Sequence, residues 1–236
     1  FECARFLDGQ DPGQEPWLPY VRWARLLVAQ AEGKSETAQT VITFNYDAVP
    51  ERLKLQPYVV LPGVTPQNKV GLHVLKLHGS TNWRYASEAQ GDVVVTQEAN
   101  FAATCAPWEL AIAAPGPGKQ QQAQRFQDLW DYAADAIKAA GAVVFLGYRI
   151  PPTDARSRRF LLENLPQGRI PIHIVLGHDT NSPDARRMKG LLQMARPQAV
   201  VEVLPLFGQD YLDAYNPDDW DRLVGASTHR YPSGSR

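Results

Sequence analysis

The stretch 142–154, AVVFLGYRIPPTD, holds the pattern that decides the fold class. Four consecutive apolar residues, 143–146, are typical of a strand that is covered on both faces. Gly147 follows directly, and because it lacks a Cβ it allows backbone to approach a ligand closely. Thr153 or Asp154 can then cap a following helix. A strand–glycine–helix junction at the carboxyl edge of a parallel sheet is where open α/β folds bind nucleotides.

Apolar patterns of helical and strand type alternate over the second half of the chain. The clearest helix is 120–140, whose apolar side chains share one face. After it we expect, in order, strand 142–146, helix 154–165, strand 170–176, helix 182–195 and strand 199–204. Strands that alternate with helices in this way indicate a parallel sheet with right-handed crossover connections.

The first half of the chain has a less regular pattern. We expect helices at 18–31 and 47–55, strands at 40–44 and 72–77, an irregular excursion at 84–118 with short strands at 93–96 and 110–114, and, near the end of the chain, one or two short helices within 208–223. We predict one α/β domain over 1–224, a Rossmann-like three-layer fold with a central, mostly parallel sheet, followed by a tail at 225–236. Since the chain begins with Phe1 and not with Met, we expect the domain to be truncated at its N-terminus.

The composition excludes several classes of protein. The chain has 236 residues, of which 44% are hydrophobic and 21% charged, and its formal net charge is −1. These values describe an ordinary globular protein with no overall attraction to nucleic acid. No apolar run reaches the roughly 18–20 residues of a membrane span. Two cysteines are too few for a disulfide framework or a four-cysteine zinc site, so we expect a cytoplasmic protein. We interpret the basic residues of 156–159 and 186–189 as solvated helix faces.

Two further strand ends carry polar residues, in 41–47 (VITFNYD) and in 74–83 (VLKLHGSTNW). His78 follows an apolar strand and stands beside a glycine, where an imidazole can act as a general base near neutral pH, although a structural histidine is an alternative. Asn45 and Asp47 can order a turn through local hydrogen bonds, or they can project from the strand end towards a ligand. The three strand ends together make a hypothesis for a binding site.

Other motifs of nucleotide or metal chemistry are missing. Gly118 and Lys119 resemble the end of a P-loop, but residue 113 is Ala where the first glycine is required, and Gln120 stands where Ser or Thr is required. The sequence has no GxGxxG, HExxH or GxSxG pattern. No spacing of His, Cys and carboxylates suggests a metal, so we predict none.

Three segments, in this order and at this spacing, resemble the motifs of the bacterial sirtuin-like domain family. They are TFNYD at 43–47, KLHGSTNW at 76–83 and FLGYRIPPTD at 145–154. The segment PGPGK before the 120–140 helix is also similar to the family's proline–lysine segment. The resemblance covers about residues 40–180.

This resemblance implies a Rossmann-like fold that binds NAD as its substrate. It makes His78 the catalytic base and places Asn45 and Asp47 at the nicotinamide and its ribose. It places Gly147 and Tyr148 at the adenosine half of NAD. The strand end 176–181 would lie near the adenine. The remaining residues of the predicted NAD site come from the same motifs and strand ends: Thr43, Phe44, Gly79, Ser80, Arg149, Asp154, Gly177 and His178.

The sequence departs from the family in three ways. The opening strand and its Gly-rich loop, which cradles the pyrophosphate, are missing, so either they precede Phe1 or NAD binds differently. Arg149 stands where the family commonly has Ser, and it can reach a phosphate or block the pocket. The four-cysteine zinc module of the deacetylase branch is absent, since only Cys105 lies between the second and third motifs.

The missing zinc module favours an NAD glycohydrolase, as in the sirtuin-like domains of bacterial anti-phage defence systems. In that family the domain is commonly joined to further domains or to a sensor partner, and it can form a homo-oligomer. Two alternatives stay open. One is an NAD-dependent protein deacylase, and the other is a non-catalytic sensor that binds NAD or ADP-ribose.

Overall fold

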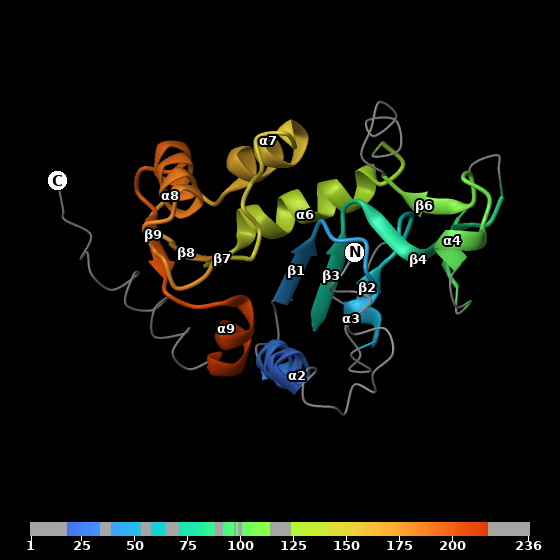
Figure 1. The fold of residues 1–236 in the computed structure, drawn as a ribbon, viewed down its shortest axis with the longest axis horizontal. Helices are drawn as coiled ribbons and strands as arrows, with labels where there is room; N and C mark the ends of the chain where they lie inside the picture. Colours follow the sequence, from blue (N-terminus) through green and yellow to red (C-terminus); the bar gives the residue numbers. More distant parts are fainter. Residues whose placement is uncertain are drawn as a thin grey trace. The chain divides into compact units, whose positions relative to one another are not determined.

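The computed structural model describes residues 18–33, 39–52, 58–64, 71–87, 92–96, 98, 101–113 and 124–216. The chain divides into two compact units, Phe1–Ala133 and Ala134–Arg236. Figure 1 shows the helices and strands of both. The boundary falls inside helix α6 (Gln127–Ala139), which begins in the first unit and ends in the second. The expected tail at 225–236 and the PGPGK segment lie outside the described residues.

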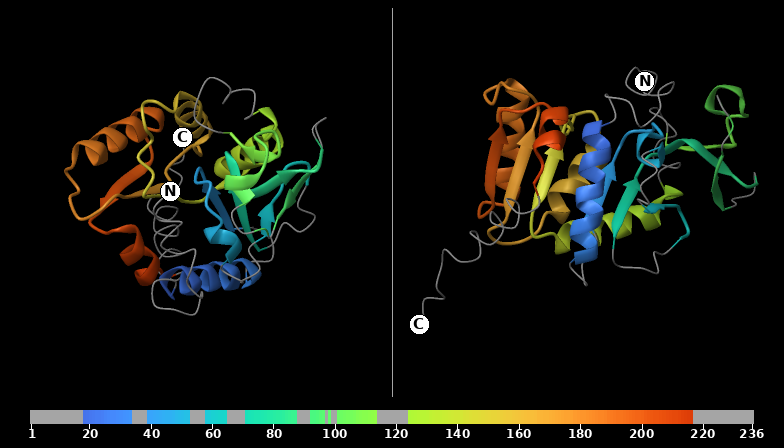
Figure 2. Two further views of the ribbon diagram at one scale, coloured as in Figure 1. Left: turned by 45° about the vertical axis from the view of Figure 1, so that its right-hand side comes forward. Right: turned by 90° about the horizontal axis from the view of Figure 1, so that it is seen from below.

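The first unit contains a parallel three-stranded sheet in the order β1-β3-β2. Its elements are α2 (Leu18–Gly33), β1 (Gln39–Thr43), α3 (Val49–Arg52), β2 (Tyr58–Val60) and β3 (Leu72–Lys76). The central strand β3 is buried at every position, and α2 packs against β1 and β3 (Figure 2). The predicted helix 18–31 and the strands 40–44 and 72–77 are confirmed, whereas the helix expected at 47–55 is described only as the short α3.

A second, antiparallel sheet in the same unit has the order β5-β4-β6. It contains β4 (Gly79–Tyr85), β5 (Val93–Val95) and β6 (Leu110–Ile112), with the short helix α4 (Phe101–Thr104) against β4. The two short strands expected in the excursion are confirmed. Strand β4 is not predicted from the sequence, because Gly79, Ser80 and Asn82 disfavour strands. The alternating buried residues Trp83 and Tyr85 stabilise it through packing.

The second unit contains a parallel sheet in the order β7-β8-β9. Its elements are β7 (Val143–Leu146), α7 (Ala155–Asn164), β8 (Pro171–Val175), α8 (Pro183–Ala195), β9 (Val200–Leu204) and α9 (Gly208–Ala214). The central strand β8 is buried throughout, and α8 packs against β8 and β9. The predicted strand–helix alternation and its parallel sheet are therefore confirmed. The mixed α/β class with parallel sheets holds for both units.

Side-chain caps fix the start of two helices in the second unit. The carboxylate of Asp154 accepts a hydrogen bond from Ser157 N–H and caps α7, so of the two caps that the sequence allows, Thr153 and Asp154, the second is used. The hydroxyl of Ser182 does the same for α8, where Pro183 occupies the first turn. Within the part of the chain that the structure describes, no helix has both the length and the apolar character that crossing a bilayer requires.

Candidate functional site

The first two motifs meet at one edge of the parallel sheet in the first unit. Strands β1 and β3 run in register, with their last residues, Thr43 and Lys76, opposite one another. The hydrogen bond from Leu77 N–H to the Thr43 carbonyl oxygen, at 3.1 Å, continues this pairing by one residue. The loops that carry Asn45 and His78 therefore leave the sheet side by side.

His78 lies in an aromatic environment at this edge. Its ring centroid is 5.2 Å from that of Phe44, 6.0 Å from that of Tyr46 and 6.0 Å from that of Trp130. The indole N–H of Trp130 donates to the carbonyl of Leu77, which fixes the indole beside the loop. Only 4% of His78 is exposed. A substrate can reach this imidazole only after a group that covers it moves.

Ala113 ties the two loops together from the end of β6. The hydroxyl of Tyr46 donates to the Ala113 carbonyl at 3.0 Å, and Ala113 N–H donates to the His78 carbonyl at 2.8 Å. One residue of the antiparallel sheet thus holds both a neighbour of Asn45 and the backbone of His78.

The loop after β1 is ordered by short-range hydrogen bonds. The backbone N–H of Asn45 donates to Thr43 Oγ1, and Val49 N–H donates to Asp47 Oδ1, each at 3.1 Å. Asp47 therefore has the turn-ordering role that the sequence allows. Asn45 is exposed, so its amide is open to a solute.

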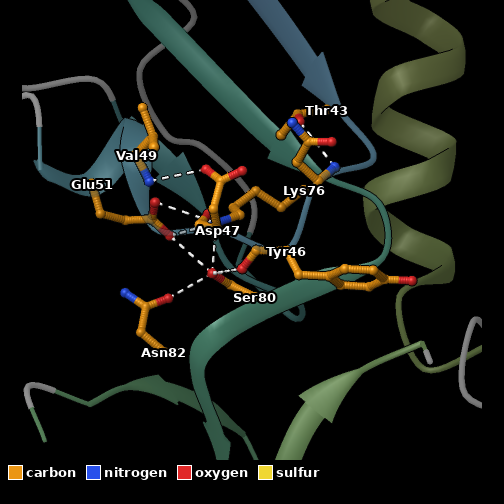
Figure 3. Close-up of polar contacts among 9 residues, drawn as sticks. Thr43, Tyr46, Asp47, Val49, Glu51, Lys76, Ser80 and Asn82 are labelled. Carbon is orange, nitrogen blue, oxygen red and sulfur yellow. Dashed lines mark hydrogen bonds and ion pairs between the residues drawn. The ribbon is translucent and has the colours of Figure 1, made fainter. Parts of the chain in front are cut away.

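Lys76 is at the centre of a buried polar cluster that includes the backbone of Asp47 in this loop (Figure 3). Lys76 is fully buried, and its ammonium donates to both oxygens of Glu51 at 3.0 and 3.2 Å, to Ser80 Oγ at 2.5 Å and to the backbone carbonyl of Asp47. Ser80 in turn donates to Asn82 Oδ1 at 2.6 Å. Burial lowers the pKa of Lys76, and the Glu51 carboxylate opposes part of that change because it stabilises the charged form.

The close approach of Lys76 and Ser80 also resembles a serine–lysine nucleophilic pair. Two observations oppose that role. Both side chains are fully buried, so no substrate can reach the hydroxyl. The ammonium is also paired with Glu51, which favours the charged form that cannot accept a proton. The cluster is therefore better explained as a structural contact that holds chain segments together.

The sequence motifs include Lys76 but predict no role for it, and they do not point to Glu51. A signal was present, because Lys76 occupies a strand that is apolar apart from His73. A lysine that is buried in this way requires a carboxylate partner. Sequence spacing alone does not say which carboxylate supplies it.

Gly79 is required by close packing against β6. Its φ is +79°, and a Cβ at this position would lie 2.0 Å from the Ala111 carbonyl oxygen. Both the left-handed backbone and the nearby strand exclude larger residues. Gly79 and Ser80, which we predicted as NAD contacts, are buried and have these structural roles.

The third motif forms the loop after β7 in the second unit. Gly147 has φ +67°, is exposed, and would place a Cβ in open space. Its N–H donates to the Val175 carbonyl, at the end of β8. Ile150 is fully buried and has φ +47°, which is a strained conformation for a β-branched residue. This loop therefore combines an open glycine with a strained turn.

Arg187, on α8, holds the strained turn. Its guanidinium donates to the carbonyls of Arg149 at 2.6 Å and Ile150 at 3.0 Å, and it pairs with Asp184 at 3.1 Å. The interpretation of Arg187 as part of a solvated helix face is wrong, because these contacts direct it to the loop. The Arg149 side chain is mostly exposed and lies 3.5 Å from Asp184.

The other residues predicted for the adenosine half lie in the same unit. Burial raises the pKa of Tyr148 to about 12, and the Asp154 carboxylate adds to this rise. His178 is exposed, its Nδ1 hydrogen-bonds the Pro205 carbonyl at 2.8 Å, and its ring meets Phe207 edge-on at 4.6 Å. Gly177 has φ +123° and lies under Phe207.

The predicted site residues thus form two sets, one in each unit. Thr43, Phe44, Asn45, Asp47, His78, Gly79 and Ser80 gather at the edge of β1 and β3. Gly147 and Gly177 follow the paired ends of β7 and β8, with Tyr148, Arg149, Asp154 and His178 in the adjoining loops. That both sets bind one ligand stays a prediction. Among the residues that the structure describes, no three His, Cys, Asp or Glu side chains are grouped as metal ligands.

Comparison with known proteins gives no family assignment. No family model and no curated protein matches the chain. Among solved structures, the fold is similar to that of a Sir2 protein in complex with the inhibitor EX-527, 2′-O-acetyl-ADP-ribose and a deacetylated p53 peptide. The similarity covers 96% of this chain and 80% of that one, at 15% sequence identity and a TM-score of 0.39. A likeness this distant assigns the chain to no family.

Proposed function

We propose that this chain is a sirtuin-like domain that binds NAD and hydrolyses it to nicotinamide and ADP-ribose. The observation that supports the proposal is the register of β1 and β3. It brings Asn45, Asp47 and His78, the residues to which the motif resemblance gives catalytic roles, to one edge of one parallel sheet. Ligands of open α/β folds bind at such carboxyl edges.

The chemistry asked of these side chains is modest. The bond between C1′ of the ribose and the nicotinamide nitrogen breaks, with oxocarbenium character at C1′ as in glycoside hydrolysis. Nicotinamide leaves as a neutral molecule, so no strong acid is required. Water adds to C1′ and loses one proton, which His78 would accept. Asn45 would position that water, and Asp47 would hold the carboxamide.

The burial of His78 favours a second candidate, a sensor that binds NAD or ADP-ribose without turnover. A general base has to come within hydrogen-bonding distance of the water that it activates. In this structure His78 is enclosed by the rings of Phe44, Tyr46 and Trp130. Binding without turnover requires no movement of these rings, whereas general-base catalysis requires that one of them moves aside.

Release of nicotinamide from NAD by the purified protein separates the candidates. For a hydrolase, His78→Ala should lower the rate about 10²–10⁴-fold, and Asn45→Ala should also lower it strongly, with circular dichroism unchanged. For a sensor, calorimetry should detect NAD or ADP-ribose binding while neither the wild type nor the variants release nicotinamide. Acyl transfer from an acyl-lysine peptide to ADP-ribose would instead identify a deacylase. Absence of both binding and turnover would reject the proposal.

We also propose, from the family resemblance alone, that the domain is the effector of a bacterial anti-phage protein with a sensor module. NAD levels in phage-infected cells that express the full protein test this step. A fall in NAD with the wild type, but not with Asn45→Ala, is expected. Equal NAD levels in both cultures would remove the defence role.

A further inference from the structure

We propose that Lys76 is a positioning residue for the reaction, because its ammonium fastens the backbone of the Asn45–Asp47 loop beside His78. This inference rests on the proposed function for its kinetic readout. The loop-fastening role itself concerns only the folded chain and has its own test.

The contacts of Lys76 join two segments that are distant in sequence, 47–51 and 76–80. A lysine ammonium has three N–H donors. Here they are shared among the Asp47 carbonyl in the loop after β1, the Glu51 carboxylate on α3, and the Ser80 hydroxyl at the start of β4 (Figure 3). The buried cation thus acts together with the hydrogen bond from Thr81 N–H to the Tyr46 carbonyl, at 2.8 Å, to hold the loop against β3 and β4.

The position of Lys76 in the chain makes this fastening relevant to chemistry. Lys76 and Ser80 are the residues two before and two after His78, and Asp47 is two residues after Asn45. A cation that fixes Asp47 from the strand that leads to His78 therefore couples the predicted water-positioning amide to the predicted base. Small misplacements of such groups have large effects on rate.

A purely structural salt bridge makes a different prediction from a positioning one. Replacing a buried ion pair with apolar residues is often neutral for stability. The variant Lys76→Met/Glu51→Leu should accordingly regain stability that Lys76→Met alone loses. It cannot regain the donor to the Asp47 carbonyl, so the loop should stay displaced.

Two variants therefore separate stability from turnover. In Lys76→Met/Glu51→Leu we expect a thermal midpoint near that of the wild type and a kcat about 10–100-fold lower, with a smaller change in KM. In Glu51→Gln the amide still accepts from Lys76, so we expect a lower midpoint but a kcat within about threefold of the wild type. The control is Glu163→Gln, which breaks the exposed Arg159–Glu163 pair on α7 and should change neither quantity.

Hydrogen exchange of the peptide 43–52 provides the readout that does not depend on NAD. In Lys76→Met/Glu51→Leu this peptide should exchange faster than in the wild type, while the peptide 155–164 should not change. If the wild type proves to have no turnover, faster exchange still supports the fastening role, and unchanged exchange overturns it. With an active wild type, a kcat that recovers together with the thermal midpoint would also overturn it.

Discussion

The paired ends of β1 and β3 in the first unit and the loop after β7 in the second unit share two features. Each has a glycine with positive φ shortly after a parallel strand, and at each a cation donates to a loop carbonyl: Lys76 to Asp47 after β1, and Arg187 to Arg149 after β7. Lys76 is fully buried and Glu51 is 14% exposed, whereas Arg187 is 31% and Asp184 41% exposed. The Lys76–Glu51 pair is therefore shielded from water and salt, whereas the Arg187–Asp184 pair is partly exposed to them.

The two glycines, like the two cations, differ in how closely other atoms surround them. Gly79 has the backbone of β6 directly against it, and Gly147 has open space. A rigid edge beside Asn45 and His78 thus contrasts with an accessible loop at Gly147. In the proposed function, the rigid edge would hold the reacting groups.

Replacing each glycine with alanine should give the largest difference in stability between the two regions. Gly79→Ala should lower the free energy of unfolding by about 4 kcal/mol, because the left-handed backbone and the contact with Ala111 both oppose a Cβ. Gly147→Ala meets only the backbone cost, about 1–2 kcal/mol. Urea denaturation of both variants measures the difference. Equal losses would show that the close approach of β6 at Gly79 is not real.

Neutralising the two carboxylates is the next largest test. Glu51→Gln leaves the buried ammonium of Lys76 without a counter-charge and should cost about 3 kcal/mol. Asp184→Asn should cost at most about 1 kcal/mol, since its pairs with Arg149 and Arg187 are partly exposed. Raising the salt concentration should shrink the effect of Asp184→Asn and leave that of Glu51→Gln almost unchanged. If the stability change in Glu51→Gln depended strongly on salt, the Lys76 cluster would have to be exposed to water.

The regular parts of both units could be predicted because their signals are local. The apolar run 143–146, the helical face of 120–140 and the carboxylate of Asp154 each act within a few residues. The gathering of Asn45 and His78 was instead a hypothesis from the polar strand ends and the motif resemblance, since the pairing of β1 with β3 does not follow from the order of strands and helices.

The contacts of Lys76 and Arg187 could not be predicted, because they join residues that are distant in sequence. Lys76 and Glu51 are 25 residues apart, and Arg187 reaches Ile150 across 37 residues. Ile150 gave no warning of a positive φ, since β-branched residues normally avoid it. Strand β4 depends on the burial of Trp83 and Tyr85 more than on its own residue preferences. Nothing in the sequence indicated that rings from two distant segments, the loop after β1 and helix α6, would lie around His78.

The central strands extend the comparison to a basic residue on each, with a smaller expected effect. Lys76 of β3 has Glu51 as a close partner, whereas His173 of β8 has Glu202 only at 3.9 Å. Burial lowers the pKa of His173 below 6.5, and Glu202 opposes part of this change. In the unfolded chain this histidine takes up a proton near pH 6.5, but in the folded chain it does so only at lower pH. Its contribution to stability is therefore complete above pH 6.5 and decreases as the pH falls from there towards the lowered pKa.

The thermal midpoint of the wild type should consequently fall more steeply below pH 6.5 than that of His173→Gln, which lacks this proton. Glu202→Gln removes the carboxylate that favours the charged form, so it should lower the pKa of His173 further and extend the decrease to lower pH. Parallel curves for the wild type and His173→Gln would mean that His173 titrates alike in the folded and unfolded chains. In that case β3 and β8 would differ in how well they shield a basic residue from water, although both strands are buried throughout.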